Sequence, residues 1–90
     1  MNDSAPKPAT GEPICRDLDV TGLNCPLPIL KTRVALRTMA AGERIRVRAT
    51  DPHSEVDFKA YCARSGHELL EFRTDDDVFE FLIRSRGPDT

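Results

Sequence analysis

The chain has 90 residues, enough for one small domain, and contains 39% apolar and 31% charged residues, an ordinary globular balance. Its formal net charge is -2 at pH 7, so we expect no stable direct binding to nucleic acid, which requires a basic domain. No apolar run approaches the roughly 20 residues of a membrane span, and the first residues lack the apolar segment of a signal peptide. We therefore expect no membrane association and a cytoplasmic location.

Both ends of the chain differ in composition from its middle. Residues 1–13 are polar and contain Pro6, Pro8 and Pro13. Residues 87–90 are similar, so we predict a disordered tail at each end. A single domain is expected over residues 14–86. The chain has three cysteines, and an odd number in a cytosolic protein argues against a disulfide framework.

Four segments have the residue pattern of β-strands. In the first, Leu18 and Val20 share one face and Asp17 and Asp19 the other. In the second, apolar residues alternate with arginines, which we place on a solvated outer face with the potential to pair with acidic residues on neighbouring strands. The predicted strands cover residues 15–21, 43–50 (with Arg44, Arg46 and Arg48 outward, and Ile45, Val47 and Ala49 inward), 68–74 and 78–85. Residues 75–77 are all aspartate and predict a turn that makes the last two strands an antiparallel hairpin.

Two segments have helical spacing. The first covers residues 26–41, with Gly42 in the C-terminal cap position. The second begins with Asp51 as its N-cap and Pro52 in its first position, and ends at Gly66. Each has an apolar face for the sheet: Ile29, Thr32, Ala35, Leu36 and Met39 in the first, and Phe58, Tyr61 and Cys62 in the second.

The order of these elements determines the expected fold. A strand–helix–strand unit of this length forms a right-handed parallel crossover. Cys25 and Asp51 then both follow the carboxyl ends of parallel strands and lie at the same edge of the sheet. We predict an α/β (α+β) two-layer sandwich in the order β-α-β-α-β-β, with a mixed four-stranded sheet and both helices on one face.

Cys25 is the candidate catalytic residue. It lies at a strand-to-helix junction, where the helix N-terminus favours an anionic sulfur and lowers a thiol pKa. Asn24, Pro26 and Pro28 surround it, and the prolines are expected to hold the junction rigid. The alternative is that Cys25 is a small apolar residue that fills the junction.

The residues around Cys25 resemble a known family. The segment G-L-N-C-P-L-P-I-L-K, residues 22–31, resembles the signature of the TusA/SirA-type sulfur carriers, and Cys-Pro-x-Pro is its most specific part. The resemblance extends through residues 49–52, 57–58, 61–62, 66–69 and 81–83. It therefore covers nearly everything outside the tails.

This resemblance implies a function. Cys25 would accept a sulfane sulfur as a persulfide from a cysteine desulfurase or a rhodanese-type donor, and pass it to an acceptor protein of a sulfur relay. No cofactor is implied. Related proteins serve tRNA thiolation, sulfur oxidation or molybdenum-cofactor maturation.

A second feature is an apolar stripe on the side of the first helix that faces away from the sheet. It begins beside Cys25, and cationic residues flank it, as expected of a docking surface. Burial under the N-terminal tail and a dimer contact are the alternatives. The predicted docking residues are Leu27, Leu30 and Val34 with Lys31, Arg33 and Arg37, and Asp51 at the same edge. The alternative function is a non-catalytic regulatory adaptor that uses this face and in which Cys25 is structural.

The remaining cysteines and histidines are expected to have structural or surface positions. Cys62 is predicted in the core, and Cys15 at the frayed start of the first strand. We expect His53 on the surface and His67 packed locally. Their spacings contain no C-x2-C or H-x3-H pair, so we predict no metal site. C-P-L-P also lacks the second cysteine of a thioredoxin-like motif.

Overall fold

The computed structural model describes residues 15–88, so the predicted tail over residues 1–13 lies outside the described part. Four strands and two helices follow in the predicted order: β1 (Cys15–Val20), α1 (Leu27–Leu36), β2 (Arg44–Ala49), α2 (Ser54–Ser65), β3 (Glu68–Asp75) and β4 (Val78–Arg84). In this part of the chain, neither helix has the length and apolar character needed to cross a membrane.

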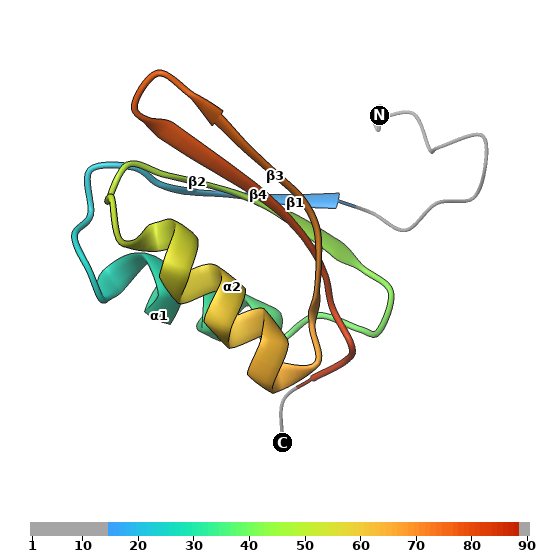
Figure 1. Cartoon of the computed structure of the whole chain (residues 1–90). Coiled ribbons are helices and arrows are strands. Elements are labelled where there is room, and N and C mark those ends of the chain that lie inside the picture. Colours follow the sequence, from blue (N-terminus) through green and yellow to red (C-terminus); the bar gives the residue numbers. More distant parts are fainter. Residues whose placement is uncertain (1–14, 89–90) are drawn as a thin grey trace, which may run out of the picture.

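The strands form one mixed sheet in the order β1-β2-β4-β3. β1 and β2 are parallel, with Cys15 opposite Arg44 and Val20 opposite Ala49. β4 is antiparallel to both of its neighbours. Figure 1 shows both helices on the same face of this sheet. The predicted two-layer sandwich and parallel crossover are confirmed.

The core lies between the sheet and the helices. The alternation in β2 buries Ile45, Val47 and Ala49 completely, as predicted. Phe58 from α2 stacks on Phe81 from β4, with ring centroids 4.2 Å apart. These apolar contacts fix α2 on the sheet, because burial of large apolar side chains is the main favourable term in folding.

The other face of the sheet is polar. Arg46 Nε lies 3.0 Å from a carboxylate oxygen of Glu80 on β4, and Arg73 on β3 lies 2.9 Å from the other oxygen. Arg84 also pairs with Glu68. Glu80 thus joins β2 to β3 across β4, and the prediction that outward arginines pair across strands is confirmed for Arg46. Exposed pairs of this kind contribute little stability individually.

The first helix is shorter than predicted. It ends at Leu36 rather than near residue 41. The N–H groups of Thr38 and Met39 bond to carbonyls three residues earlier, which tightens the last turn and directs Met39 into the core, where it is 1% exposed. Gly42, with a φ of +92°, belongs to a separate turn closed by the Glu43 N–H and the carbonyl of Ala40 at 3.1 Å.

The second helix begins later than predicted. Its N-cap is His53, not Asp51, and its first residue is Ser54. The Ser54 N–H donates to the carbonyl of Asp51 at 3.0 Å, and the Asp51 carboxylate accepts the His53 N–H at 3.2 Å. Asp51 and Pro52 therefore form a β-turn that precedes the helix, a common position for this pair of residues.

The chain after β4 remains attached to the domain. The Ser85 N–H donates to the carbonyl of Glu43 at 2.7 Å, and the Ser85 carbonyl accepts the Gly42 N–H at 2.8 Å. Gly87, at the start of the predicted C-terminal tail, is buried and donates its N–H to Ser85 Oγ at 2.9 Å.

The stacked pair gives a stability prediction. Phe58 is fully buried, so Phe58→Ala should lower the free energy of unfolding by about 3 to 5 kcal/mol, because a cavity adds to the lost transfer free energy. Val56→Ala, at a position 71% exposed on the same helix, should change it by less than about 0.5 kcal/mol. Urea unfolding measures both. Equal midpoints would contradict a role of Phe58 in anchoring α2.

Candidate functional site

Cys25 lies in the connection between β1 and α1. Gly22 in this connection has a φ of +83°, which glycine adopts without strain, and its N–H donates to Thr50 Oγ1 at 2.8 Å. This bond ties the end of β1 to the end of β2. The Leu27 N–H donates to the carbonyl of Asn24 at 2.8 Å, which closes the turn in front of α1. Cys25 is exposed at the edge of the sheet.

A cleft between the two helices borders Cys25. Its volume is about 280 Å³, and it is lined on the α1 side by Cys25, Pro26, Ile29 and Arg33 and on the α2 side by Asp57, Ala60, Tyr61 and Arg64. A larger hollow of about 520 Å³ lies at the β3–β4 hairpin, but its lining contains no cysteine. A nucleophilic sulfur and charged groups of both signs therefore meet in the smaller cleft.

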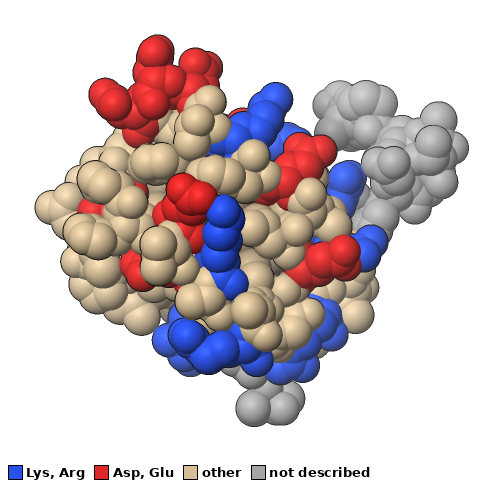
Figure 2. Space-filling view, in the orientation of Figure 1, with Lys and Arg blue, Asp and Glu red and all other residues tan. Residues whose placement is uncertain are grey.

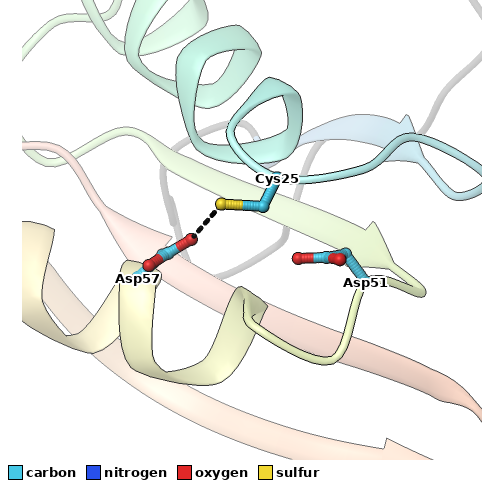
Figure 3. A group of neighbouring side chains, drawn as sticks. All are labelled: Cys25, Asp51 and Asp57. Atoms are coloured by element: carbon cyan, nitrogen blue, oxygen red, sulfur yellow. Dashed lines mark hydrogen bonds between the residues drawn. The ribbon is translucent and has the colours of Figure 1, made fainter.

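Two carboxylates lie beside the sulfur of Cys25, as Figure 3 shows. The thiol donates a hydrogen bond to Asp57 Oδ2 on α2, at 3.4 Å. The sulfur and one oxygen of each of Asp51 and Asp57 all lie within 4.8 Å of one another. The parallel crossover thus brings Cys25 and Asp51 to the same edge, as predicted, and the first turn of α2 adds Asp57.

The electrostatic environment of Cys25 differs from the predicted one. We expected N–H groups at the start of α1 to stabilise a thiolate, and this was wrong. Of residues 26–28, two are prolines without an N–H, and the third uses its N–H within the turn. The hydrogen bond to Asp57 raises the pKa of Cys25, and desolvation and the negative charges of Asp57 and Asp51 act in the same direction.

The closeness of Cys25, Asp51 and Asp57 raises the question of a metal centre. Zinc sites combine thiolates and histidines in sets of four, or of three with a water. Here a single thiol faces two carboxylates, and its proton is donated to one of them. Acidic groups lie this close in many proteins that hold no ion, so we assign no metal or cofactor to these residues.

The two histidines lie in different environments. His53 is exposed just before α2, with Nδ1 3.6 Å from Asp51 Oδ2. His67 is 2% exposed, and its Nδ1 accepts the Arg86 N–H at 3.1 Å. The prediction that His67 packs locally is confirmed. Among residues 15–88, neither histidine joins Cys25 in a group that could hold a metal ion.

Comparison with known proteins identifies the family. The model of the family described as sulfurtransferase TusA matches residues 16–85. The chain belongs to the TusA family. The sulfur carrier protein TusA of Allochromatium vinosum is 45% identical over 69 residues, which cover 77% of this chain and 91% of that protein. A putative sulfur carrier protein of Neisseria meningitidis serogroup A is also 45% identical over 69 residues, covering 77% and 93%. The sulfur carrier protein TusA of Pseudomonas putida is 42% identical over 70 residues, covering 78% and 88%.

The three cysteines of this TusA-family chain differ in accessibility. Cys62 is 6% exposed on the sheet side of α2, as predicted, and burial raises its pKa to about 11. Cys15 is half-buried at the start of β1. Cys25 is the exposed thiol. Burial makes a thiol unreactive because it disfavours the thiolate and blocks access.

The predicted apolar stripe lies on the surface of the TusA-family domain. Leu27, Leu30 and Val34 are 45%, 41% and 59% exposed. Leu30 and Val34 also line an apolar hollow of about 370 Å³ together with Leu18 of β1. The stripe therefore continues from Cys25 along α1 toward the edge strand β1.

Figure 2 shows acidic side chains at the tip of the β3–β4 hairpin and basic ones near the end of α2.

The charged residues predicted for docking occupy three kinds of position. Lys31 is exposed on α1, and Arg37 is exposed directly after its last residue. Arg33 is half-buried, with its guanidinium 5.7 Å from the ring centre of Tyr61, a cation–π contact across the cleft. Asp51 is 7% exposed. It therefore affects Cys25 through its charge and has little surface for a partner protein to contact.

Sequence reasoning did not assign a site role to two charged residues of α2. Asp57 accepts the thiol hydrogen bond, and Arg64 lines the cleft. The signal for Asp57 was available. It directly precedes the buried Phe58 and lies one turn into a helix expected to begin at the same edge as Cys25.

These environments predict an order of reactivity for the thiols. In timed alkylation near neutral pH followed by peptide mapping, Cys25 should be labelled first, because it is the exposed thiol and access outweighs its raised pKa. Cys62 should be labelled last, because it is buried and has a pKa of about 11. Labelling of Cys62 should appear only when the protein is unfolded in urea. Faster labelling of Cys15 or Cys62 than of Cys25 in the folded protein would contradict the site assignment.

Proposed function

We propose that this chain is a sulfurtransferase that accepts a sulfane sulfur on Cys25 as a persulfide and relays it to an acceptor protein. The observation that carries the proposal is an exposed cysteine at a cleft between two helices, in a chain of the TusA family. The names of the relatives, sulfur carrier proteins, support it. A free-thiol carrier requires a reducing compartment, so we place the relay in the cytoplasm.

The transfer moves one sulfur atom without net oxidation. The Cys25 thiol loses its proton, and its sulfur attacks the terminal sulfur of a persulfide on the donor. A new S–S bond forms on Cys25 as the S–S bond of the donor breaks, and the donor cysteine leaves as a thiolate that takes up a proton. The acceptor cysteine repeats the step on the loaded carrier. All three pathways implied by the family resemblance draw on this chemistry.

The partners supply what the carrier lacks. Residues 15–88 contain no phosphate-binding loop and no serine–histidine–aspartate set. A cysteine desulfurase or a rhodanese-type protein is the proposed donor, and a cysteine protein of a sulfur relay is the proposed acceptor. Each must bring its own cysteine to Cys25, so both dock around the α1 stripe that begins there.

The persulfide gives a direct test. After incubation with a cysteine desulfurase and cysteine, the intact mass of the protein should increase by one sulfur atom, and the increase should disappear on reduction. Cys25→Ser should show no increase, because the hydroxyl cannot form a persulfide. It should unfold at nearly the wild-type temperature, because Cys25 is exposed.

Cys62→Ser and Cys15→Ser are the matched controls, and both should still gain the sulfur atom. A wild-type protein that never gains sulfur from any donor would favour the adaptor function. A large loss of thermal stability in Cys25→Ser would favour a structural Cys25.

The docking surface gives a second test. Lys31→Glu combined with Arg37→Glu should slow persulfide loading by the donor severalfold to about tenfold, because complementary charge raises association rates. Arg33 is left intact, since it contacts Tyr61. Added salt should slow loading of the wild type as well.

Arg48→Glu combined with Arg84→Glu is the control, because it makes the same charge change on the open face of the sheet. It also removes the exposed pair between Arg84 and Glu68, and such a pair contributes little stability. This variant should load at a rate close to that of the wild type. Equal rates for wild type and the α1 variant would remove α1 from the docking surface. Slow loading by the sheet variant alone would move the docking surface to the open face of the sheet.

A further inference from the structure

The contact between Cys25 and Asp57 distinguishes two states of the sulfur. In the thiol state, the S–H group donates to Asp57 Oδ2 at 3.4 Å, and Figure 3 shows the sulfur directed from the α1 side toward α2. A thiolate has no proton to donate and is repelled by the same carboxylate. Asp51, within 4.8 Å, adds a second negative charge. The site therefore accommodates an uncharged thiol better than an anion.

The cations around the cleft do not cancel these charges at close range. Arg33 on α1 and Arg64 on α2 line the cleft, and Arg33 lies over the Tyr61 ring at 5.7 Å. Among residues 15–88, no basic nitrogen is within ion-pair distance of Asp57. Asp51 has His53 Nδ1 at 3.6 Å, and this side chain is 73% exposed and carries a charge only if protonated.

Steric fit reinforces the charge effect. A persulfide adds a sulfur at a bond length of about 2.05 Å, in the range of directions that the thiol hydrogen occupied. Along the 3.4 Å line from Cys25 Sγ to Asp57 Oδ2, this atom would overlap the carboxylate oxygen. The terminal sulfur of a persulfide is also more acidic than a thiol, so it carries negative charge near neutral pH. Both effects direct it away from α2.

We propose that Asp57 is a positioning residue that holds the empty carrier as an inward thiol and turns the terminal sulfur of the loaded carrier outward, toward the acceptor. This inference rests on the proposed function, since it assigns a role in each half of the transfer. The empty carrier is protected against unwanted reactions by the hydrogen bond. In the loaded carrier, the terminal sulfur of the persulfide faces outward because the carboxylate of Asp57 repels it.

The two halves of the proposal predict opposite effects of one substitution. Asp57→Asn keeps the size of the side chain and removes its charge. In the empty protein, loss of the negative charge stabilises the thiolate and lowers the pKa of Cys25. The rate of alkylation by iodoacetamide at pH 7 should therefore rise about threefold to tenfold, and the midpoint of its pH profile should move to lower pH. Iodoacetamide is uncharged, so long-range steering does not contribute.

In the loaded protein, the same substitution should slow alkylation. Cys25 is loaded with inorganic tetrasulfide, which transfers one sulfur atom to the thiolate and leaves as trisulfide, so no donor protein is needed. Asp57→Asn leaves the steric contact unchanged but removes the repulsion and offers an amide N–H to the anion, so the terminal sulfur turns partly into the cleft. Alkylation of that sulfur, followed by intact mass, should be about threefold slower than in the wild type.

Two variants serve as controls. Glu55→Gln removes the same charge from the same turn of α2, where Glu55 pairs with Lys59 rather than with Cys25, and both rates should stay within about twofold of the wild type. Asp57→Glu keeps the charge and should retain the wild-type order of rates, slow for the empty and fast for the loaded protein. Circular dichroism confirms folding of each variant.

Changes in the same direction in both states, or in neither state, would overturn the proposal. Equal effects of Glu55→Gln and Asp57→Asn on the alkylation rates would also overturn it. They would show that the net charge of α2 matters rather than the contact between Asp57 and Cys25. A wild-type protein that takes sulfur from tetrasulfide but from no donor protein would instead count against the proposed function. The rates of the empty protein do not depend on that outcome.

Discussion

The parallel pairing of β1 with β2 is the constraint on which the site depends. Because both strands run in the same direction, the connections that follow them leave at the same edge of the sheet. One connection carries Cys25 and the other carries Asp51. The hydrogen bond from Gly22 to Thr50 joins the two strand ends at that edge. An antiparallel arrangement of these strands would place the thiol and the carboxylates at opposite ends of the molecule.

The helices complete the site through their packing on one face of the sheet. Phe58 anchors α2 against β4, and the preceding residue, Asp57, is thereby directed toward α1 and the sulfur of Cys25. A core contact and a site contact thus come from adjacent residues on one helix. This coupling explains how a chain of only 90 residues can hold a defined cleft with a small core.

The chemistry of the site suits a carrier better than an independent catalyst. An enzyme that attacks its own substrate generally lowers the pKa of its cysteine with a base or a helix N-terminus. Here the neighbours of Cys25 raise that pKa instead. A carrier that meets many thiols and disulfides benefits from a thiol of low intrinsic reactivity. Transfer then takes place only when a docked partner brings its own cysteine to the site. The exposed Leu27, Leu30 and Val34 form the surface that we propose for such partners.

The order of elements, the inward face of β2 and the position of an exposed cysteine at the strand-to-helix junction could all be predicted from the sequence. Alternation in β2 and the Cys-Pro-x-Pro segment are local patterns, and local patterns fix periodicity and turn position. The ends of the helices were less accurate. Asp51 has the residue type of an N-cap, but its carboxylate closes a preceding turn with His53, and α1 ends early because Met39 is drawn into the core.

The direction of the pKa shift of Cys25 comes from contacts that form only in the folded protein. The sequence indicated a helix N-terminus and hence a stabilised thiolate. That inference omitted Asp57, which lies 32 positions away along the chain and reaches the sulfur only because two helices pack side by side on one sheet. Residues 26–28 provide no free N–H to oppose it, because two are prolines and Leu27 uses its N–H within the turn. The sign of a pKa shift depends on every charge within a few ångströms, and such distances between remote residues are set by packing, which no local pattern in the sequence records.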